Sequence, residues 1–427
     1  MEFSYKNSLL KNSTVIRHFK NLDKAIQNAA SATYADSYAS VLLPFDKNYL
    51  TQIKALVKKK QALNPGYIVV IGIGGSNLGT IAVQEAVLGR LYNQLSPKTK
   101  ILYADTCDPV SVSNILEIIT PALKRKSNVL LNVITKSGTT AETIANFKVL
   151  LSTLKKYKKD YKKYVVVITD SYSRLWQSAK DDFDILDIPG NVGGRYSVFS
   201  AVGIFPLAML GIDIDGLLSG ARNAFKVCTS HNIKNNPAAL SAIVQYLHYS
   251  SGKNVSDLFL FSPELESVGR WYRQLMGESI GKERNLRGKK VNVGITPTYS
   301  IGSTDLHSVA QLYLAGPYDK LTTFVSVKTQ KTDLNSPNDA IYLEMLKNKS
   351  FSFIMNAILL GTKSAFRSSK RAFMEVKLDA LDEYSVGEFL QFKMLEMMYL
   401  GSLLNINAFD QPNVEEYKTE TKKILER

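Results

Sequence analysis

The feature of this sequence that most restricts its fold is a repeated order of apolar strand, polar turn and helix. Each apolar run ends at a stretch rich in Gly, Ser, Thr or Asp, and a helical pattern comes next. Near-continuous apolar strands that alternate with helices are typical of a parallel sheet covered on both faces. In the first half of the chain, the predicted strands are 67–71, 101–104, 129–134 and 164–168.

The same order returns after a mostly helical stretch at 198–250. The predicted strands there are 258–261, 291–295, 322–327 and 373–378, and helices are predicted at 339–346, 351–367, 386–404 and 413–426. We therefore expect an α/β protein with two doubly wound parallel-sheet domains in three-layer α/β/α arrangement. The expected divisions are a helical N-terminal segment at 1–60, α/β domains at 61–197 and 198–380, and a C-terminal helical segment at 381–427.

Composition excludes several classes of protein. Two cysteines in 427 residues form no disulfide framework and no CxxC pattern, which is typical of a reducing compartment. The first twenty residues lack an apolar core, and no stretch approaches 18 uninterrupted apolar residues. We expect a cytoplasmic protein without a membrane span. The net charge of +15 fits a nucleic-acid partner, a small anionic substrate or a compositional habit of the source organism, and charge alone leaves all three open.

The first Gly-rich turn, at 72–79, lies between a predicted strand and a predicted helix. Asn77 stands where a dinucleotide-binding GxGxxG motif needs its third Gly, and Thr80 stands where a P-loop needs Lys. Nucleotide binding is therefore disfavoured. Two interpretations remain: a tight turn with no ligand, or an anion site in which backbone N–H groups of Gly75 and neighbours act with the Ser76 hydroxyl.

A second turn, at 135–140, also comes after a strand and opens a helix. It holds four hydroxyl side chains and one Lys in six residues. A single Ser or Thr suffices to cap a helix, so four hydroxyls favour an anion site over a simple cap. Two such turns at the carboxyl ends of neighbouring strands could converge on one phosphate.

Three further Gly-rich stretches each carry an ionisable side chain. They are 193–197 with Arg195, 277–281 with Glu278, and 302–308 with His307. Taken singly, each residue also fits an ordinary surface or buried position. Four histidines without a CxxC or HExxH motif predict no catalytic metal.

Taken together and in order, these stretches resemble the phosphoglucose isomerase (glucose-6-phosphate isomerase) family over residues 67–418. The most specific blocks are 72–79, 192–203 and 409–418, and 135–140, 276–279 and 302–308 support them. The resemblance implies two sugar-isomerase (SIS-type) domains and a homodimer with its active site at the interface. It implies interconversion of glucose 6-phosphate and fructose 6-phosphate in glycolysis and gluconeogenesis, through ring opening and a cis-enediol, without a cofactor or metal.

The resemblance also implies roles for individual residues. Glu278 resembles the base that moves a proton between C1 and C2, and Arg195 resembles the cation that stabilises the anionic intermediate. His307, from the partner subunit, and Lys418 resemble the ring-opening pair. The remaining matches are the phosphate cradle of Gly75, Ser76, Thr135, Lys136, Ser137 and Thr140, the substrate contact Gln411, and Glu142 as a polar residue near the His.

The sequence departs from the family pattern at two positions. Thr135 stands where the family usually has Ser, which preserves the hydroxyl. Asn413 stands where the family usually has Gly, and Asn tolerates a positive φ better than most residues.

Three rival functions stay open at this point. A non-catalytic sugar-phosphate sensor would need the cradle but not Glu278, His307 and Lys418. An isomerase for an amino-sugar or mannose phosphate would differ in substrate preference. A nucleic-acid-binding protein would show affinity that falls steeply with salt, but the sequence has no recognised nucleic-acid motif.

Overall fold

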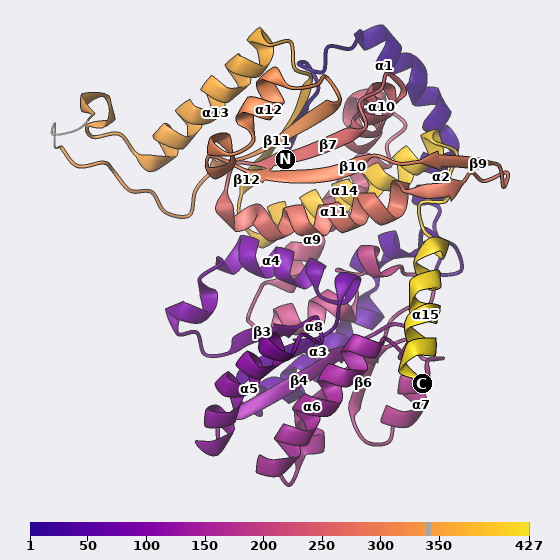
Figure 1. The fold of residues 1–427 in the computed structure, drawn as a ribbon, viewed down its shortest axis with the longest axis vertical. Coiled ribbons are helices and arrows are strands. Elements are labelled where there is room, and N and C mark those ends of the chain that lie inside the picture. Colours follow the sequence, from indigo (N-terminus) through magenta and orange to yellow (C-terminus); the bar gives the residue numbers. More distant parts are fainter. Residues whose placement is uncertain (339–342, 427) are drawn as a thin grey trace.

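The computed structural model describes residues 1–338 and 343–426 of the chain. Within these residues, the strands form two five-stranded sheets and one two-stranded sheet. Figure 1 shows the two large sheets in separate halves of the molecule, the first below the second, with helices packed around each. The predicted α/β fold with two sheets is confirmed.

The first sheet has the strand order β3-β2-β4-β5-β6 and is parallel throughout. Its strands are β2 Pro65–Ile71, β3 Lys100–Ala104, β4 Asn128–Ile134, β5 Val165–Thr169 and β6 Asp184–Asp187. Central strands β4 and β5 are buried along nearly their whole length, which explains their unbroken apolar sequences. The covering helices are α3 Lys47–Gln61, α4 Leu78–Leu88, α5 Pro109–Lys124, α6 Ala141–Tyr157, α7 Arg174–Ala179 and α8 Ala201–Met209.

The second sheet has the strand order β1-β12-β11-β7-β10. Its parallel strands are β7 Val255–Leu260, β10 Thr296–Ile301, β11 Lys320–Thr329 and β12 Phe373–Ala380. Counted in chain order, these four strands take the same positions as β2, β3, β4 and β5 in the first sheet. The fifth position differs, because β1 (Glu2–Ser4) pairs antiparallel with β12 there.

Two expectations from the sequence are wrong in detail. The segment 1–60 is not helical throughout, because β1 is a strand of the second sheet, and three residues are too few to show a periodic pattern. The strand predicted at 291–295 overlaps β9 (Lys290–Val293), which pairs with β8 (Lys282–Arg284) outside the main sheet. The main-sheet strand is β10, a polar edge strand whose apolar signal is weak. Residues 339–342 of the predicted helix 339–346 lie outside the described residues.

The remaining helices surround the second sheet and join the two halves. They are α1 Asn12–Phe19, α2 Asp23–Ala30, α9 Ile214–Cys228, α10 Pro237–Ser250, α11 Glu266–Ile280, α12 Ala310–Ala315, α13 Phe351–Ser368, α14 Glu383–Leu403 and α15 Glu415–Leu425. Helix α14 is buried on all sides and packs against α9, α10 and α11, as expected of a helix whose apolar residues are spread around its whole circumference. The C-terminal segment therefore contributes to the core, and the domain limits expected from the sequence stay a prediction. No helix in the described part of the chain is both long and apolar enough to cross a bilayer.

Candidate active site

The two predicted anion-binding turns lie side by side at the carboxyl edge of the first sheet. Strands β2 and β4 are adjacent and parallel, with Ile71 opposite Val133. A Cβ atom on Gly72 would lie 2.8 Å from both the carbonyl oxygen of Ile134 and the Cβ of Ser76. Only glycine permits this approach, which brings the turn with Ser76 against the end of β4. This edge is the position at which open α/β sheets bind ligands.

The hydroxyl groups of the second turn form a cluster at the start of α6. The Thr140 Oγ1 lies 3.0 Å from the Thr135 Oγ1 and 3.5 Å from the Ser137 Oγ. Thr140 occupies the N-cap position of α6, yet its side chain makes no capping hydrogen bond. The interpretation of this turn as a simple helix cap is therefore wrong for Thr140, and the hydroxyls gather beside the positive end of the helix dipole.

Lys136 has a different surrounding from the hydroxyl cluster. Its ammonium group donates to the carbonyl oxygens of Gly190 at 2.5 Å and Val192 at 3.0 Å. Burial lowers the pKa of Lys136, and the negative charge of Asp170 opposes this effect. Lys136 thus ties the second turn to the loop that leads into Arg195.

The 193–197 stretch meets the first Gly-rich turn directly. A Cβ atom on Gly75 would lie 2.2 Å from the carbonyl carbon of Gly194. Real Cβ contacts are never that short, so glycine at position 75 is required for the two turns to touch. This contact brings Arg195 to the same edge of the sheet as Ser76.

Arg195 is the centre of the candidate site. Its side chain is 1% exposed, and its Nε donates to the Oγ of Ser279 at 2.8 Å. Its Nη1 donates to the Oε1 of Gln411 at 2.6 Å and to the Oε2 of Glu278 at 3.3 Å. Its Nη2 donates to the carbonyl oxygens of Ala408 at 2.6 Å and Asp410 at 3.1 Å. A buried guanidinium with all its nitrogens engaged is a fixed positive charge.

Glu278 lies in the last turn of α11, and its side chain is 30% exposed. One carboxylate oxygen faces Arg195, and the other accepts a hydrogen bond from the Nε2 of Gln274 at 2.9 Å. That nitrogen also lies 3.0 Å from where a Cβ of Gly74 would be, at a backbone φ of +60°. Glu278 is therefore held between Arg195 and the glycine turn, and it remains open to a ligand.

The sequence reasoning missed two residues of this cluster, Gln274 and Lys282. Gln274 precedes Glu278 by four residues, so the helical repeat puts them on one face, and this spacing was the available signal. The Lys282 ammonium donates to the backbone oxygens of Glu278 and Asp410, both at 2.6 Å. Burial and, secondarily, the charge of Arg195 lower the pKa of Lys282, while the Asp410 carboxylate opposes them.

Three predicted residues lie apart from this cluster. His307 is exposed at the end of the 3₁₀ turn Thr304–His307. Lys418 is on α15, where its ammonium forms an ion pair of 2.6 Å with Glu415. Glu142 is half-buried in the first turn of α6. Among the described residues, no hydrogen bond or ion pair joins any of the three to Arg195 or Glu278.

Asn413, the departure from the family pattern, lies within the 3₁₀ turn Pro412–Val414. Its amide donates to the Oε2 of Glu283 at 3.4 Å. A 3₁₀ turn has negative φ angles, so this position does not demand glycine. Asn413 is therefore compatible with the backbone that presents Gln411.

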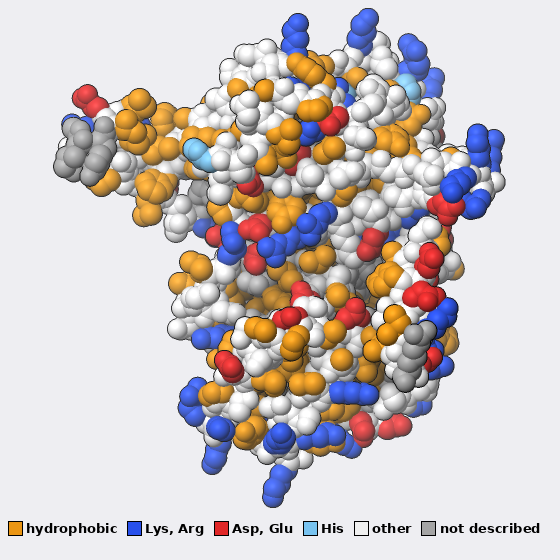
Figure 2. Space-filling view, in the orientation of Figure 1, with side chains coloured by type: hydrophobic (Ala, Val, Ile, Leu, Met, Phe, Trp, Pro, Cys, Tyr) orange, Lys and Arg blue, Asp and Glu red, His pale blue; other side chains and the backbone are white. Residues whose placement is uncertain are grey.

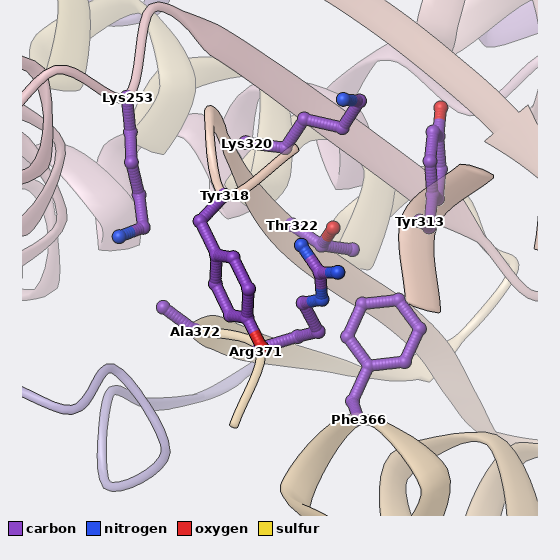
Figure 3. Close-up of a pocket in the computed structure, with 8 residues that line it drawn as sticks. All are labelled: Lys253, Tyr313, Tyr318, Lys320, Thr322, Phe366, Arg371 and Ala372. Carbon is purple, nitrogen blue, oxygen red and sulfur yellow. The ribbon is translucent and has the colours of Figure 1, made fainter. Parts of the chain in front are cut away.

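The surface is hollowed between the two halves of the molecule (Figure 2). Lys and Arg side chains gather along the upper rim of this hollow with acidic side chains among them, and further acidic side chains lie along its lower rim. A separate cavity of about 10 Å³ lies at the amino end of the second sheet (Figure 3). Its lining includes Tyr313, Tyr318, Lys320 and Arg371. That volume holds about one water molecule, so this cavity is no substrate site.

Comparison with known proteins identifies the family. The profile of the phosphoglucose isomerase family matches residues 47–427. The chain belongs to this family. It is therefore an isomerase, as the sequence blocks predict.

Named relatives agree with this membership. A glucose-6-phosphate isomerase of Carboxydothermus hydrogenoformans is 37% identical over 371 residues, covering 84% of this chain and 79% of the relative. A glucose-6-phosphate isomerase of Methanocaldococcus jannaschii is 32% identical over 425 residues, covering 98% of each chain. These phosphoglucose isomerase relatives span most or nearly all of the sequence.

Solved structures share the fold. A hypothetical protein from Thermus thermophilus has a TM-score of 0.88 at 29% identity, covering 99% of each chain. A glucose-6-phosphate isomerase of Chlamydia trachomatis has a TM-score of 0.85 at 19% identity, covering 99% of this chain and 88% of the other. At 19% identity, the similarity to this second structure is evidence for a shared fold only.

Proposed function

We propose that this phosphoglucose isomerase family member interconverts glucose 6-phosphate and fructose 6-phosphate. The observation that carries the proposal is the contact of the Glu278 carboxylate with the buried Arg195 guanidinium, beside two turns rich in Gly, Ser and Thr. An aldose–ketose isomerase needs a base, a fixed cation and a remote binding site for phosphate, and these three features supply one of each. The relatives' names support the same substrate pair.

The phosphate group is proposed to bind at the carboxyl edge of the first sheet. Its ligands are the hydroxyls of Ser76, Thr135, Ser137 and Thr140, with the backbone of Gly75 and the first turn of α6. Hydroxyl and backbone donors satisfy phosphate oxygens without burying several charges. Lys136 supports this site by holding the adjoining loop, as its bonds to Gly190 and Val192 indicate. Phosphate binding far from the reacting carbons orients the sugar.

Glu278 is proposed to move the proton between the two reacting carbons. In the forward direction its carboxylate takes the proton from C2 of the open-chain aldose, the electron pair forms the C1–C2 double bond, and the C1 carbonyl electrons move onto O1, which gives a cis-enediolate. The C2 hydroxyl proton passes to O1 through the cis-enediol. The proton held by Glu278 then returns to C1 as the carbonyl forms at C2, unless it exchanges with solvent first. The negative charge that develops on oxygen lies near Arg195, which remains protonated throughout and does not reorganise. Gln411 contacts Arg195 at 2.6 Å and is proposed to bind the sugar hydroxyls beside it.

Ring opening is proposed to use His307 and Lys418. One group donates a proton to the ring oxygen while the other accepts the proton of the anomeric hydroxyl, so the ring bond breaks without net gain of charge. His307 is exposed in its own chain, and we propose that it reaches the site of a partner subunit, where Glu142 lies near it. This assignment explains why His307 makes no contact with Glu278 of the same chain.

A homodimer is supported by the surface between β11 and α13. The described residues of this segment project from the body of the molecule (Figure 1). Its described residues and the adjoining start of α13 expose the large apolar side chains of Leu334, Met345, Phe351 and Phe353. Apolar side chains of this number on a projecting segment are typical of a surface that another chain covers.

The proposed reaction is tested by proton NMR of glucose 6-phosphate in D₂O with purified protein, beside Glu278→Gln. We expect fructose 6-phosphate to form with deuterium at its C1 and, through the reverse reaction, deuterium to enter at C2 of glucose 6-phosphate, and only with the unmutated protein. Conversion without deuterium would contradict a proton exchange with solvent at Glu278. No conversion by the unmutated protein would contradict the proposed function and favour a sugar-phosphate sensor.

The shared site is tested by mixing two inactive variants, His307→Ala and Glu278→Gln. If His307 acts across the interface, a mixed dimer contains one site with both residues intact, and partial activity returns. Activity that fails to return after subunits have exchanged, shown by mass spectrometry of the mixed dimer, would contradict the interface assignment.

A further inference from the structure

One buried carboxylate joins both ends of the segment that carries His307. Asp257 lies in β7, and its Oδ1 accepts a hydrogen bond from the Ser300 Oγ at 3.0 Å and from the Tyr313 hydroxyl at 2.9 Å. Ser300 is near the end of β10, and Tyr313 is in α12. His307 lies midway between these two donors in the sequence. The hydrogen bonds to Asp257 therefore join the two ends of the segment 300–313 and close it into a loop.

Further contacts strengthen this junction at Asp257. The Thr298 Oγ1 donates to the same carboxylate oxygen at 2.7 Å, and the Ser300 and Tyr313 hydroxyl oxygens lie 3.1 Å apart. The other carboxylate oxygen, Oδ2, is buried and has no hydrogen-bond partner among the described residues. All three donors therefore converge on a single atom of a side chain that is fully buried.

The segment 300–313 also has internal hydrogen bonds that fold it as a unit. The Asp305 carboxylate accepts from the backbone N–H of Ile301 at 2.7 Å and from the Ser308 Oγ at 2.8 Å. The backbone N–H of Tyr313 donates to the carbonyl oxygen of Val309 at 3.0 Å. Because these bonds fix the internal shape, the contacts at the two ends decide how the unit and its His307 are oriented.

Helix α12 is anchored on one side by the Tyr313 hydroxyl and on the other side by Arg371. Figure 3 shows the hydroxyl of Tyr313 pointing away from the Arg371 guanidinium. Arg371 donates to the carbonyl oxygens of Leu314, at 3.0 Å from Nε, and Gly316, at 2.7 Å from Nη2. The Tyr313 hydroxyl is thus committed to Asp257, and the end of α12 has little freedom to compensate if that bond is lost.

The stability of the fold does not by itself explain why an acidic residue occupies position 257. Asp257 shares its face of β7 with Phe259 and Phe261, and these pack in an aromatic cluster with Phe324 and Tyr313. Burial raises the pKa of Asp257, although its three hydroxyl partners oppose the rise. Buried ion pairs can often be replaced by apolar residues without loss of stability, so burial of a carboxylate is by itself weak evidence for a stabilising role.

We infer that Asp257 is a positioning residue for His307, acting through Ser300 and Tyr313. The inference rests on the proposed ring-opening role of His307. Asp257 itself does not touch the substrate. It orients the segment 300–313 so that the His307 imidazole meets the site of the partner subunit.

The first test compares Asp257→Leu with Asp257→Asn. Leucine removes the shared acceptor, so we expect kcat on glucose 6-phosphate to fall ~10- to 100-fold, as misplaced catalytic groups usually cost. KM should stay near its original value, because the phosphate turns belong to the other sheet. Asparagine keeps the Oδ1 acceptor and should restore most of kcat. The matched control is Val376→Ala, which creates a cavity in β12 and loosens the same sheet without touching segment 300–313.

Several outcomes would overturn the inference. They are an unchanged kcat in Asp257→Leu, a loss that Asp257→Asn fails to restore, or an equal loss in Val376→Ala. If Asp257→Leu does not fold, the double substitution Ser300→Ala with Tyr313→Phe removes the same two bonds while retaining the acid. That variant is expected to show the same fall in kcat, and a normal kcat would overturn the inference.

The second test asks whether Asp257 acts through His307. In the His307→Ala background there is no imidazole to orient, so adding Asp257→Leu should lower the residual kcat by less than about threefold, because two changes that act through one group do not add. Losses that multiply in full would show that Asp257 acts elsewhere. A chain that leaves glucose 6-phosphate unconverted without any mutation would refute the proposed function itself, whereas these results in an active enzyme refute only the positioning role.

Discussion

The two large sheets share a strand order and differ in the segments that connect their strands. In the first sheet, the turns after β2 and β4 are short and rich in Gly, Ser and Thr, and they meet at the carboxyl edge. In the second sheet, the corresponding strands β7 and β11 lead into α11 and into the projecting segment before α13. The second half contributes long ionisable side chains instead, Glu278 at the end of α11 and His307 after β10.

This difference shows how one topology can serve two chemical tasks. Binding a phosphate needs many donors close to the backbone, and small side chains at strand ends allow that approach. Moving protons needs ionisable groups on longer side chains, held at their tips by other residues. Under the proposed function, the first half binds the phosphate and the second half transfers the proton. Substitutions in each half test that division, from the largest expected effect to the smallest.

The largest effect is expected from Glu278→Gln in the second half. Removing a general base typically costs about 10²–10⁴ in rate, so kcat should fall by that factor. KM should change little, because the proposed phosphate site is in the first half. Steady-state kinetics check this, with Glu283→Gln as the control, since Glu283 is an acid five residues away that does not touch Arg195. A rise in KM as large as the fall in kcat would break the proposed division.

The next largest effect is expected from Arg195→Lys, which tests the junction between the two halves. A single ammonium cannot replace the five contacts of the guanidinium with Ser279, Glu278, Gln411 and two backbone oxygens. Loss of a preorganised donor costs about 10²–10³ in kcat. The melting temperature should fall as well, because buried acceptors lose their donors.

The control for Arg195→Lys is Arg222→Lys, a half-buried Arg whose Nη1 donates to the carbonyl oxygen of Pro44 at 2.8 Å. It should leave kcat unchanged. Full activity in Arg195→Lys would show that a positive charge alone suffices at this position.

A third prediction concerns acid stability, which should be limited by the second half. Burial lowers the pKa of His248 in α10 to about 4, with the charge of Lys253 acting in the same direction and the bond to the Ser8 carbonyl opposing both. The unfolded chain takes up this proton near pH 6.5 and the folded chain only near pH 4. Stability is therefore present above about pH 6.5 and lost as the pH falls through this window, by about 3 kcal/mol at about pH 4.

Urea unfolding at a series of pH values checks this, with His248→Gln expected to flatten the dependence between pH 6.5 and 4. The control is His231→Gln, since His231 is exposed beside Asp23. An unchanged slope in His248→Gln would assign the acid sensitivity to other groups.

The smallest effect is expected in the first half, from Thr140→Val. Valine has the same shape but no hydroxyl, so one bond to a charged phosphate is lost, worth about 1.5–3 kcal/mol. KM should rise about tenfold or more with kcat retained, the reverse of Glu278→Gln. Thr153→Val, in the same helix α6 but bonded to the Val149 carbonyl, is the control and should leave KM unchanged. A loss in kcat without a rise in KM would assign Thr140 to proton transfer instead of phosphate binding.

The accuracy of the sequence predictions depends on the range of the interactions. The apolar strands β4, β5 and β7 were predicted because burial on both faces leaves a local run of apolar residues. The polar edge strand β10 and the three-residue β1 lack that signature, and both were missed. The Gly-rich turns were recognised because close backbone approach requires specific residues at fixed spacing, as the contact of Gly75 with Gly194 illustrates.

The sequence by itself determined the α/β class, the family and the residue types that the proposed reaction requires, because these depend on local patterns and on ordered motifs. Only the tertiary structure decided which of them meet. Arg195 contacts Glu278 and Gln411 across separations of 83 and 216 residues, and Lys136 turns to the loop of Gly190 instead of the hydroxyl cluster. Hydrogen-bond geometry is set to tenths of an ångström by packing between distant elements, and such packing leaves no local trace in the sequence.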